Sequence, residues 1–345
     1  MSDINIDNKA YKKKILLTGG AGYIGSHVAV ALLESGFDIV IADNLSNSSE
    51  ESLSGIRKIT GRDFSFYNID VCDRSLLVDL FEREELDATI HLAGYKAVGD
   101  AVKSPLKYYR NNIASTTSLL EVMDNYGVRK IILSSSANVY GESSVVPVTE
   151  GCETGNCTNP YGRTKWVQEE MLRDLFTADD RWNIVILRYF NPAGAHESGL
   201  IGEMYGKSPS NIVPSLALAA NGDIPYFRVL GTGYNTPDGT GIRDYIHITD
   251  LANGHVMAIK KLYSQPNVYT YNLGTGRGYS VLETIKAFEK ASGREIPYKI
   301  EAARDGDIAE MYACSDKARE ELGWTAKYGI EDICRSAWNW HNKIY

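Results

Sequence analysis

Residues 14–27, KILLTGGAGYIGSH, join a short apolar run to a glycine-rich turn. Gly19, Gly22 and Gly25 stand three residues apart, and the helical pattern GSHVAVALLESG begins at the last of them. Such glycines let the backbone turn tightly and approach a pyrophosphate group, which then lies at the positive end of the helix. A plain tight turn would also use glycines, but their place between a first strand and a first helix predicts a dinucleotide-binding site.

Apolar runs alternate with helical patterns from this stretch to residue 192. We expect strands in the segments KILLTGG, DIVIADN, FSFYNID, ATIHLAG, KIILSSS and NIVILRYFN, with helices between them. Strands that alternate with helices form a parallel sheet covered on both faces. The sequence therefore predicts an α/β fold with a doubly wound parallel sheet of the Rossmann type.

The regular alternation of strand and helix patterns ends after Pro192, where Gly- and Pro-rich loops separate shorter elements. We expect residues 1–192 to form the dinucleotide-binding domain and residues 193–345 to form a smaller α/β substrate domain. The segments around 244–275 contain a helical pattern and the strand-like run VYTYNLGTG, and we expect them to rejoin the first domain.

Length and composition exclude several classes of protein. The chain of 345 residues can bury a large core, and 43% hydrophobic content without low-complexity runs indicates an ordered soluble protein. A net charge of −8 without a broad basic run argues against a nucleic-acid partner. No run of about 18 apolar residues occurs, so we expect no membrane span.

The cysteines and the N-terminal region favour a cytoplasmic location. The five cysteines are an odd, scattered set, and Cys152 and Cys157 have no nearby histidine to complete a metal site. We expect reduced thiols and no metal. The apolar run after Lys13 is interrupted by four glycines, which a secretory signal would not carry.

An aspartate follows the second predicted strand. Asp43 lies 18 residues after Gly25, where a carboxylate can accept hydrogen bonds from the adenosine ribose and would repel a 2′-phosphate. This position favours NAD over NADP, although an aspartate that only closes the turn at the strand end is the alternative.

The segment NPYGRTK, residues 159–165, places Tyr161 four residues before Lys165. On a helix that begins at Pro160, both side chains share one face. The fifth strand ends at Ser136, at the same ligand edge of the sheet. A positive Lys165, together with oxidised nicotinamide, would lower the pKa of Tyr161, so we expect Tyr161 to be the acid/base group and Ser136 to hold a substrate hydroxyl.

A second pair with this spacing, Tyr126 and Lys130, has a different context. The pair straddles Gly127, which is a helix-stop signal just before the fifth strand. A helix end and a strand start share no common face, so we expect this pair to be a coincidence of composition.

Six motifs extend the pattern along the chain: TGGAGYIGSH, LAGYKAVGDA, SSSANVYG, NPYGRTK, LRYFNPAGAH and DGTGIRDYIHITDLANGHV. Together they resemble the UDP-glucose 4-epimerase family, which belongs to the extended short-chain dehydrogenases/reductases. The resemblance runs from about Lys13 to the final helix, and the motifs occur in the family's order.

The resemblance implies two sets of binding residues. The NAD contacts would come from Gly19, Gly22, Tyr23, Ile24, Gly25, Asp43, Asn44, Asp70, Val71, Leu92, Ala93, Lys96, Asn111, Ser134, Tyr161, Lys165 and Tyr189. The UDP-sugar contacts would come from Lys96, Ser136, Asn138, Tyr161, Phe190, Asn191, Asn211, Arg243, Arg304, Asp307 and Met311. Without the surrounding motifs, ordinary surface salt bridges would explain the arginines.

The activity implied is reversible 4-epimerisation of UDP-galactose and UDP-glucose in galactose metabolism, through a 4-keto intermediate and with tightly held NAD. The N-acetylated UDP-sugars would be slower substrates. The family also implies a homodimer formed through the helices at 106–125 and 161–176, although apolar positions on those helices could equally be ordinary core.

Two departures from the family pattern bear on detail. Asn138 stands where many relatives have threonine, and Met311 occupies a position whose size helps to select the substrate.

A 4,6-dehydratase would need an Asp-Glu pair where Ala137 and Asn138 stand. A UDP-sugar decarboxylase or another oxidoreductase stays open, whereas an intact Ser136, Tyr161 and Lys165 argue against a silent dinucleotide sensor.

Overall fold

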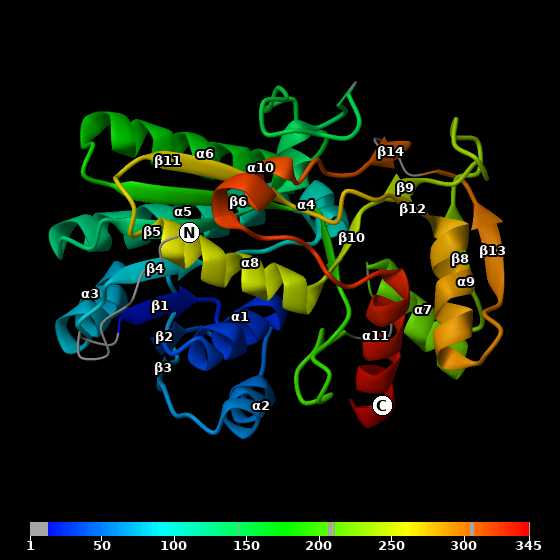
Figure 1. Ribbon diagram of the computed structural model, residues 1–345, viewed down its shortest axis with the longest axis horizontal. Helices are drawn as coiled ribbons and strands as arrows, with labels where there is room; N and C mark the ends of the chain where they lie inside the picture. The colour runs from blue at the N-terminus through cyan, green and yellow to red at the C-terminus, as the bar shows by residue number, and fades with distance from the viewer. Residues whose placement is uncertain (1–12, 144, 206–208, 210, 304–306, 345) are drawn as a thin grey trace.

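The computed structural model describes residues 13–143, 145–205, 209, 211–303 and 307–344. Within these residues the main body is a seven-stranded sheet in the order β11-β6-β5-β4-β1-β2-β3, and every neighbouring pair is parallel (Figure 1). Its strands are β1 (Lys14–Thr18), β2 (Asp38–Ala42), β3 (Ser65–Tyr67), β4 (Ala88–His91), β5 (Lys130–Ser136), β6 (Asn183–Tyr189) and β11 (Val268–Leu273). The expected α/β fold with a doubly wound parallel sheet is confirmed.

Helices cover both faces of this sheet. One face packs against α1 (Tyr23–Glu34), α2 (Glu50–Thr60), α8 (Ile248–Lys261) and α10 (Asp316–Leu322), and the other against α3 (Arg74–Arg83), α5 (Pro105–Asn125) and α6 (Pro160–Ala178). Side chains of β1 alternate between the two layers, since Ile15 and Leu17 join the α1 side whereas Leu16 joins the α3 side. This two-sided burial explains why the strands are nearly continuous apolar runs.

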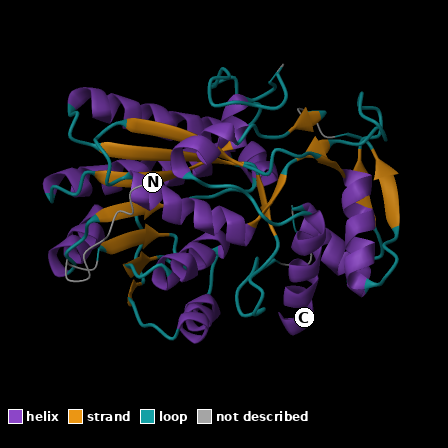
Figure 2. Cartoon of the chain, in the orientation of Figure 1, coloured by secondary structure: helices purple, strands orange, loops and turns teal. Residues whose placement is uncertain are grey.

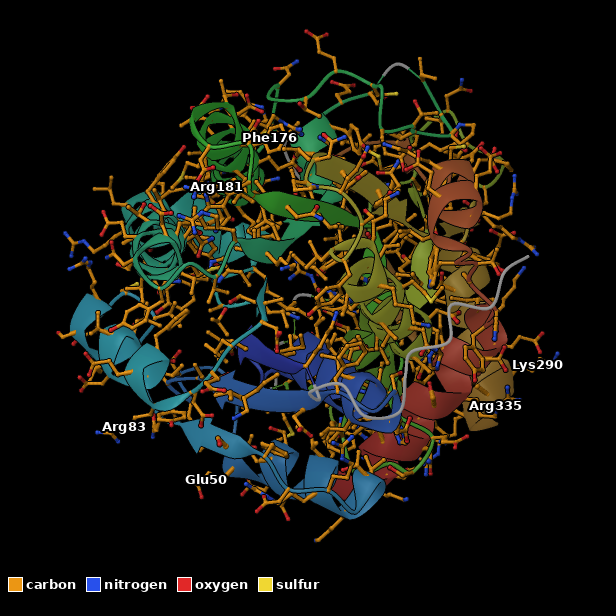
Figure 3. The ribbon with its side chains drawn as sticks, turned by 60° about the vertical axis from the view of Figure 1, so that its left-hand side comes forward. Glu50, Arg83, Phe176, Arg181, Lys290 and Arg335 are labelled. Carbon is orange, nitrogen blue, oxygen red and sulfur yellow. The ribbon has the colours of Figure 1, made fainter. Side chains whose placement is uncertain are left out.

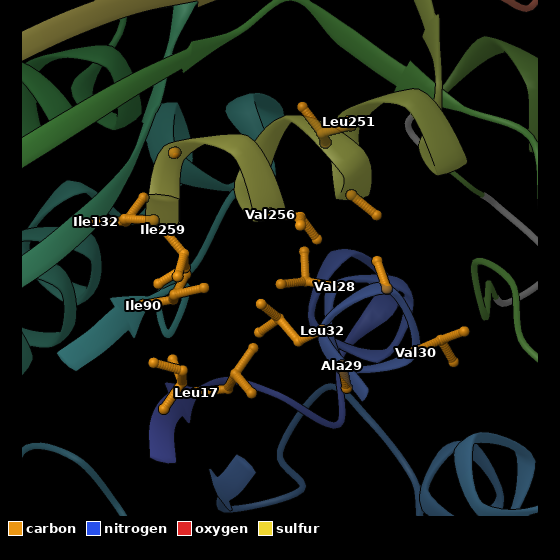
Figure 4. Close-up of a cluster of buried hydrophobic side chains, with 14 of the residues drawn as sticks. Leu17, Val28, Ala29, Val30, Leu32, Ile90, Ile132, Leu251, Val256 and Ile259 are labelled. Atoms are coloured by element: carbon orange, nitrogen blue, oxygen red, sulfur yellow. The ribbon is translucent and has the colours of Figure 1, made fainter. Parts of the chain in front are cut away.

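The α1 layer shows how the core is built. Val28 and Leu32 of α1 face Val256 of α8, with Leu17 and other sheet residues beneath them (Figure 4). All of α1 from Gly25 to Leu33 is buried, so this helix is apolar nearly all round instead of amphipathic. Each fully buried aliphatic side chain of this kind contributes about 1.5–3 kcal/mol of transfer free energy.

A second body lies at the far end of the molecule, where short strands are set among helices (Figure 2). Its core lies between α7 (Ile212–Asn221), α9 (Val281–Ser292) and α11 (Ile330–Ile344). The short strands are β7 (Asn191–Ala193) with β10 (Tyr245–His247), β8 (Phe227–Leu230) with β13 (Tyr298–Glu301), and β9 (Ile242–Arg243) between β12 (Tyr279–Ser280) and β14 (Glu310–Met311). The remaining elements are α4 (Val98–Lys103) and the 3₁₀ turn η1 (Ala137–Tyr140).

The order of the large sheet locates the ligand edge. From β1 the chain proceeds outward through β2 and β3 on one side, and then through β4, β5 and β6 on the other. In open sheets of this kind ligands bind outside the carboxyl ends of the strands, where the order reverses. Charged side chains such as Glu50, Arg83 and Lys290 instead point away from the body (Figure 3). No helix among the described residues is both long and apolar enough to cross a membrane.

Candidate active site

The glycine turn between β1 and α1 forms one wall of a cavity of about 590 Å³. Gly19 has a φ of +72°, and a Cβ there would lie 2.8 Å from the backbone nitrogen of Ala93, so only glycine fits. Gly22 caps α1 without a side-chain hydrogen bond, and the first turn of α1 holds no acidic residue. The N–H groups at this helix end therefore have no side-chain partner, which is the arrangement that binds a phosphate.

Asp43 lies in the same cavity and is held in place by three donors. Its Oδ2 accepts from the backbone nitrogen of Ala21 at 3.1 Å, and its Oδ1 accepts from the nitrogen of Leu45 at 2.9 Å and from Ser48 Oγ at 2.8 Å. The carboxylate is thus tied both to the glycine turn and to the loop after β2, which fixes its position at the cavity wall.

The structure brings most of the predicted cofactor residues together in this cavity. Its walls include Gly19, Gly22, Tyr23, Ile24, Gly25, Asp43, Asn44, Asp70, Val71, Leu92, Ala93, Lys96, Asn111 and Ser134. Tyr161 and Tyr189 line a second cavity instead, and Lys165 is not among the described residues that line either one.

Lys165 is buried one turn after Tyr161 on α6, with 4% of its surface exposed. Its Nζ donates to the backbone oxygen of Ser134 at 2.7 Å. Burial lowers the pKa of Lys165 to about 8, and Glu169 acts in the opposite direction. The hydrogen bond to Ser134 places the Lys165 Nζ beside the last residues of β5, at the site.

Burial raises the pKa of Tyr161 to about 12, and a hydrogen bond from Ser136 opposes this rise. Burial thus acts against the lowering of this pKa that the sequence led us to expect from Lys165 and oxidised nicotinamide. Removing a phenolate from water disfavours it, and in this structure that effect is the larger one.

The other tyrosine–lysine pair does not converge, as expected. Tyr126 caps the end of α5 and Lys130 begins β5. The hydroxyl of Tyr126 donates to Glu82 on the surface at 3.3 Å.

The second cavity, of about 410 Å³, lies between the end of the large sheet and the second body. Its walls include the predicted substrate residues Lys96, Ser136, Asn138, Tyr161, Phe190, Asn191, Asn211, Arg243, Asp307 and Met311, together with Tyr189. The predicted contact Arg304 lies outside the described residues. Met311 is 7% exposed and packs in a cluster with Phe190 and Ala313.

Two predicted sugar-nucleotide contacts pair with each other. Arg243 Nη2 donates to Asp307 Oδ1 at 2.5 Å, and Arg243 Nη1 donates to the backbone oxygen of Ile242 at 2.8 Å. The guanidinium is therefore oriented before any ligand reaches it, which the linear sequence did not indicate.

Tyr189 is anchored from behind the cavity. Its hydroxyl lies 2.6 Å from Nε2 of the buried His255, whose Nδ1 lies 2.9 Å from the backbone oxygen of Leu251. Since a carbonyl can only accept, Nδ1 carries the imidazole hydrogen and the Tyr189 hydroxyl donates to Nε2.

Sequence reasoning missed Glu203, which lines both cavities. Its Oε1 accepts from Lys96 Nζ at 2.8 Å and from Asn211 Nδ2 at 2.7 Å, so one carboxylate joins the two bodies. Glu203 lies in a loop without periodicity, and no sequence signal would have found it. Asn159 was also missed, although an asparagine before a proline and a helical run is a recognisable cap signal.

Comparison with known proteins identifies the class to which this fold and site belong. The chain matches the model of the NAD dependent epimerase/dehydratase family over residues 15–274 and belongs to that family. This match confirms NAD as the cofactor, in agreement with the glycine turn and Asp43.

Individual relatives narrow the class. The UDP-glucose 4-epimerase of Bacillus subtilis (strain 168) is 53% identical over 328 residues, which cover 95% of this chain and 96% of the relative. The UDP-glucose 4-epimerase of Mus musculus is 50% identical over 337 residues, with coverages of 96% and 97%. The crystal structure of the Bifidobacterium longum UDP-glucose 4-epimerase, in complex with NAD+ and UDP, matches with a TM-score of 0.93 at 50% identity and covers 96% of this chain and 99% of that chain. The resemblance seen in the motifs is thereby confirmed.

Proposed function

We propose that the protein interconverts UDP-galactose and UDP-glucose by inverting C4 of the sugar through a 4-keto intermediate. The observation that carries the proposal is the junction of the two cavities, because Tyr23, Lys96, Glu203 and Asn211 line both. A sugar hydroxyl next to Tyr161 would therefore lie beside the cofactor. The full-length similarity to UDP-glucose 4-epimerases supports the same activity.

The first cavity suits NAD. Asp43 and Asn44 would bind the adenosine ribose, and Asp70 and Val71 would flank the adenine. Asn111 would line the channel, whereas Lys96 and Lys165 would contact the nicotinamide ribose and Tyr189 would lie near the nicotinamide. The uncapped start of α1 supports a diphosphate at the glycine turn.

When bound, NAD supplies the reversible acceptance of hydride from C4. Tyr161 removes the proton of the 4-hydroxyl as a phenolate, and Ser136 holds that hydroxyl in line. Because burial raises the pKa of Tyr161, the positive charges of Lys165 and of oxidised nicotinamide must offset burial for the phenolate to form near neutral pH. Once the 4-keto sugar has turned about its phosphate linkage, Tyr161 returns the proton with the configuration inverted.

The polar residues of the second cavity would hold the rest of the substrate. Asn191, Asn211 and Arg243 would bind the diphosphate, and Asp307 the uridine ribose. A planar guanidinium can bind two phosphate oxygens at once, and its hydrogen bond to Asp307 supports a fixed orientation. Phe190 would contribute backbone groups near the sugar.

Incubation of pure protein with UDP-galactose tests this function. Formation of UDP-glucose without added NAD is the expected result, because hydride and proton both return to the sugar. Loss of water, release of carbon dioxide or an absence of reaction would contradict the proposal.

We also propose the division of the chain into an NAD-binding domain, residues 1–192 rejoined by about 244–275, and a UDP-sugar-binding domain formed by the rest of 193–345. The place of β11 beside β6 and the packing of α8 on α1 support this division.

We propose further that the protein is a cytoplasmic homodimer that uses the helices at 106–125 and 161–176. Leu106 and Val102, at the start of this surface, are 80% and 61% exposed, which favours a covered interface. The described cysteines are all free thiols, which suits a reducing compartment. Light scattering should give twice the chain mass of 38.2 kDa, and the mass of a single chain would contradict the dimer.

A further inference from the structure

A chain of hydrogen bonds connects the start of α6 with Ser136. The backbone nitrogen of Gly162 donates to Asn159 Oδ1 at 2.8 Å, and Asn159 Nδ2 donates to Asn138 Oδ1 at 2.9 Å. Asn138 Nδ2 then donates to Ser136 Oγ at 3.0 Å. Two amides therefore separate the helix that carries Tyr161 from the hydroxyl that faces it.

The donor and acceptor of each hydrogen bond in this series follow from the first bond, which the Gly162 N–H donates. A backbone N–H can only donate, so the side-chain oxygen of Asn159 must face Gly162 and its amino group must face Asn138. Asn138 in turn receives that bond on its oxygen, which leaves its amino group for Ser136. No alternative orientation of either amide satisfies all three bonds.

Asn138 also fills the second acceptor position of Ser136. Its backbone nitrogen donates to the same Oγ at 3.2 Å, and a serine hydroxyl has two acceptor positions and one hydrogen. With both acceptor positions used, the hydrogen of Ser136 must be donated to another group. Tyr161 lines the same cavity, and a hydrogen bond from Ser136 opposes the rise that burial causes in the pKa of Tyr161.

Close packing makes this arrangement rigid. Asn159 is 8% exposed, and a Cβ on Gly162 would lie 2.8 Å from the backbone oxygen of Asn138. The first turn of α6 thus rests directly on the backbone of the 3₁₀ turn that follows Ser136, and the hydrogen bonds of the two amides hold their orientation.

We propose that Asn138 is a positioning residue that, supported by Asn159, holds the Ser136 hydroxyl as a donor. Its single hydrogen goes to the phenolate of Tyr161 before substrate binds, and to the oxygen of the sugar hydroxyl once substrate is bound. This inference rests on the proposed function and replaces the direct sugar contact expected for Asn138 from the sequence. An asparagine suits this role because its amide oxygen accepts from Asn159 while its amino group donates to Ser136.

Other groups also act on Tyr161. Tyr108 on α5, Lys165 on α6 and Tyr189 at the end of β6 are its titratable neighbours, and Lys96 and Glu203 line the same cavity. All five stay unchanged in the variants below, so a shift in the titration of Tyr161 reports on Asn138.

The decisive variant is Asn138→Asp, which keeps the size of the side chain. The new carboxylate can still accept from Asn159, but it cannot donate to Ser136 and would draw the Ser136 hydrogen toward itself. Loss of that donor and the added negative charge both disfavour the phenolate, so the pKa of Tyr161 should rise by about one unit, which is a tenfold lower phenolate fraction below that pKa.

The primary readout is the near-ultraviolet absorbance of phenolate against pH in NAD-loaded protein, with Tyr161→Phe as the background. This titration needs no turnover. In parallel, kcat for UDP-galactose should fall roughly tenfold at a pH below the pKa and its profile should move to higher pH, whereas KM should stay within about twofold.

Two matched variants complete the test. Asn138→Thr restores one donor and should give an intermediate pKa. Asn125→Asp makes the same charge change on the exposed end of α5, at the opposite edge of the sheet, and should change nothing. If Asn138→Asp fails to fold, Asn138→Ala takes its place and should give a smaller rise.

An unchanged pKa of Tyr161 in the Asn138 variants would overturn the proposal. So would a raised KM with an unchanged pKa, since that result would identify a direct sugar contact. A shifted titration in protein that never converts UDP-galactose would instead refute the proposed function and leave the positioning role intact.

Discussion

Tyr161 and Tyr126 each precede a lysine by four residues, and only their surroundings separate them. Tyr161 starts a helix at the ligand edge, half-buried beside Ser136, whereas Tyr126 ends a helix at the opposite edge and bonds to Glu82. The chemistry therefore resides in the position of the phenol within the sheet and not in the spacing alone.

Replacement of Tyr161 by phenylalanine should lower kcat by roughly 10²–10⁴-fold, because it removes the proton acceptor of the 4-hydroxyl. NAD content should be unchanged, since the ring remains in place. Turnover of UDP-galactose and NAD released on unfolding are the two measurements.

Tyr126→Phe is the matched control, with the same loss of one hydroxyl from a tyrosine four residues before a lysine. It should keep kcat within about twofold, as expected for an exposed surface group. Near-normal turnover in the Tyr161 variant would refute its role as the acid/base group.

Met311 should set the tolerance for the substituent at C2 of the sugar. Its side chain is unbranched and packs beside Phe190 at the cavity wall, so it can fold aside at modest cost. UDP-galactose and UDP-glucose should be the main substrates, with slower turnover of the N-acetylated pair. Met311→Tyr should suppress the N-acetyl activity selectively, and Met311→Ser should raise it.

The measurement is kcat/KM for both substrate pairs in the three proteins. A ratio that stays constant across the series would mean that Met311 is only core filling.

At the scale of elements, periodicity predicted most of the large sheet. The run KILLT became β1, and the helix predicted after Pro160 became α6 with Asn159 as its cap. Local patterns sufficed because the inner strands are buried on both faces and most helices begin or end at a glycine, a proline or a capping side chain. Contacts between distant loops could not be predicted in this way: Glu203 meets Lys96 across more than a hundred residues, and no local pattern records that pairing.

Two helix-capping side chains allow the effect of a lost cap on stability to be separated from its effect on activity. Asn159 caps α6 and also supports Asn138, whereas Ser280 caps α9 in a capping box away from both cavities. Asn159→Ala and Ser280→Ala should each lower the free energy of unfolding by about 0.5–2 kcal/mol. Only Asn159→Ala should also lower kcat and raise the pKa of Tyr161.

Urea unfolding and the pH profile of kcat separate the two effects. Equal loss of activity in both variants would show that general loosening, and not the amide chain, explains the change.

At the scale of the whole molecule, two bodies meet at one site. The large sheet and its helices provide the glycine turn, Tyr161 and Lys165, and the second body provides Arg243 and Met311. Glu203 joins Lys96 to Asn211 across the junction. A reaction that returns hydride to its own substrate benefits from this enclosure, because NAD need not leave between turnovers.

Retention of NAD can be tested directly. Protein unfolded after long dialysis should release NAD or NADH and no NADP. Asp43→Ala should speed the loss of cofactor roughly 10–100-fold, the effect of removing hydrogen bonds to a charged group. Asp63→Ala, at a surface carboxylate that pairs with Arg57, should not change retention. Recovery of NADP would contradict the assignment of Asp43 to the ribose.

The most direct test of the central claim uses UDP-galactose that carries deuterium at C4. Pure protein without added cofactor is incubated with it, and the product is examined by nuclear magnetic resonance. If the hydride leaves C4 and returns to the same carbon with the configuration inverted, UDP-glucose should form with deuterium retained at C4. Loss of the label to water, or accumulation of an oxidised or decarboxylated sugar instead of UDP-glucose, would contradict the account.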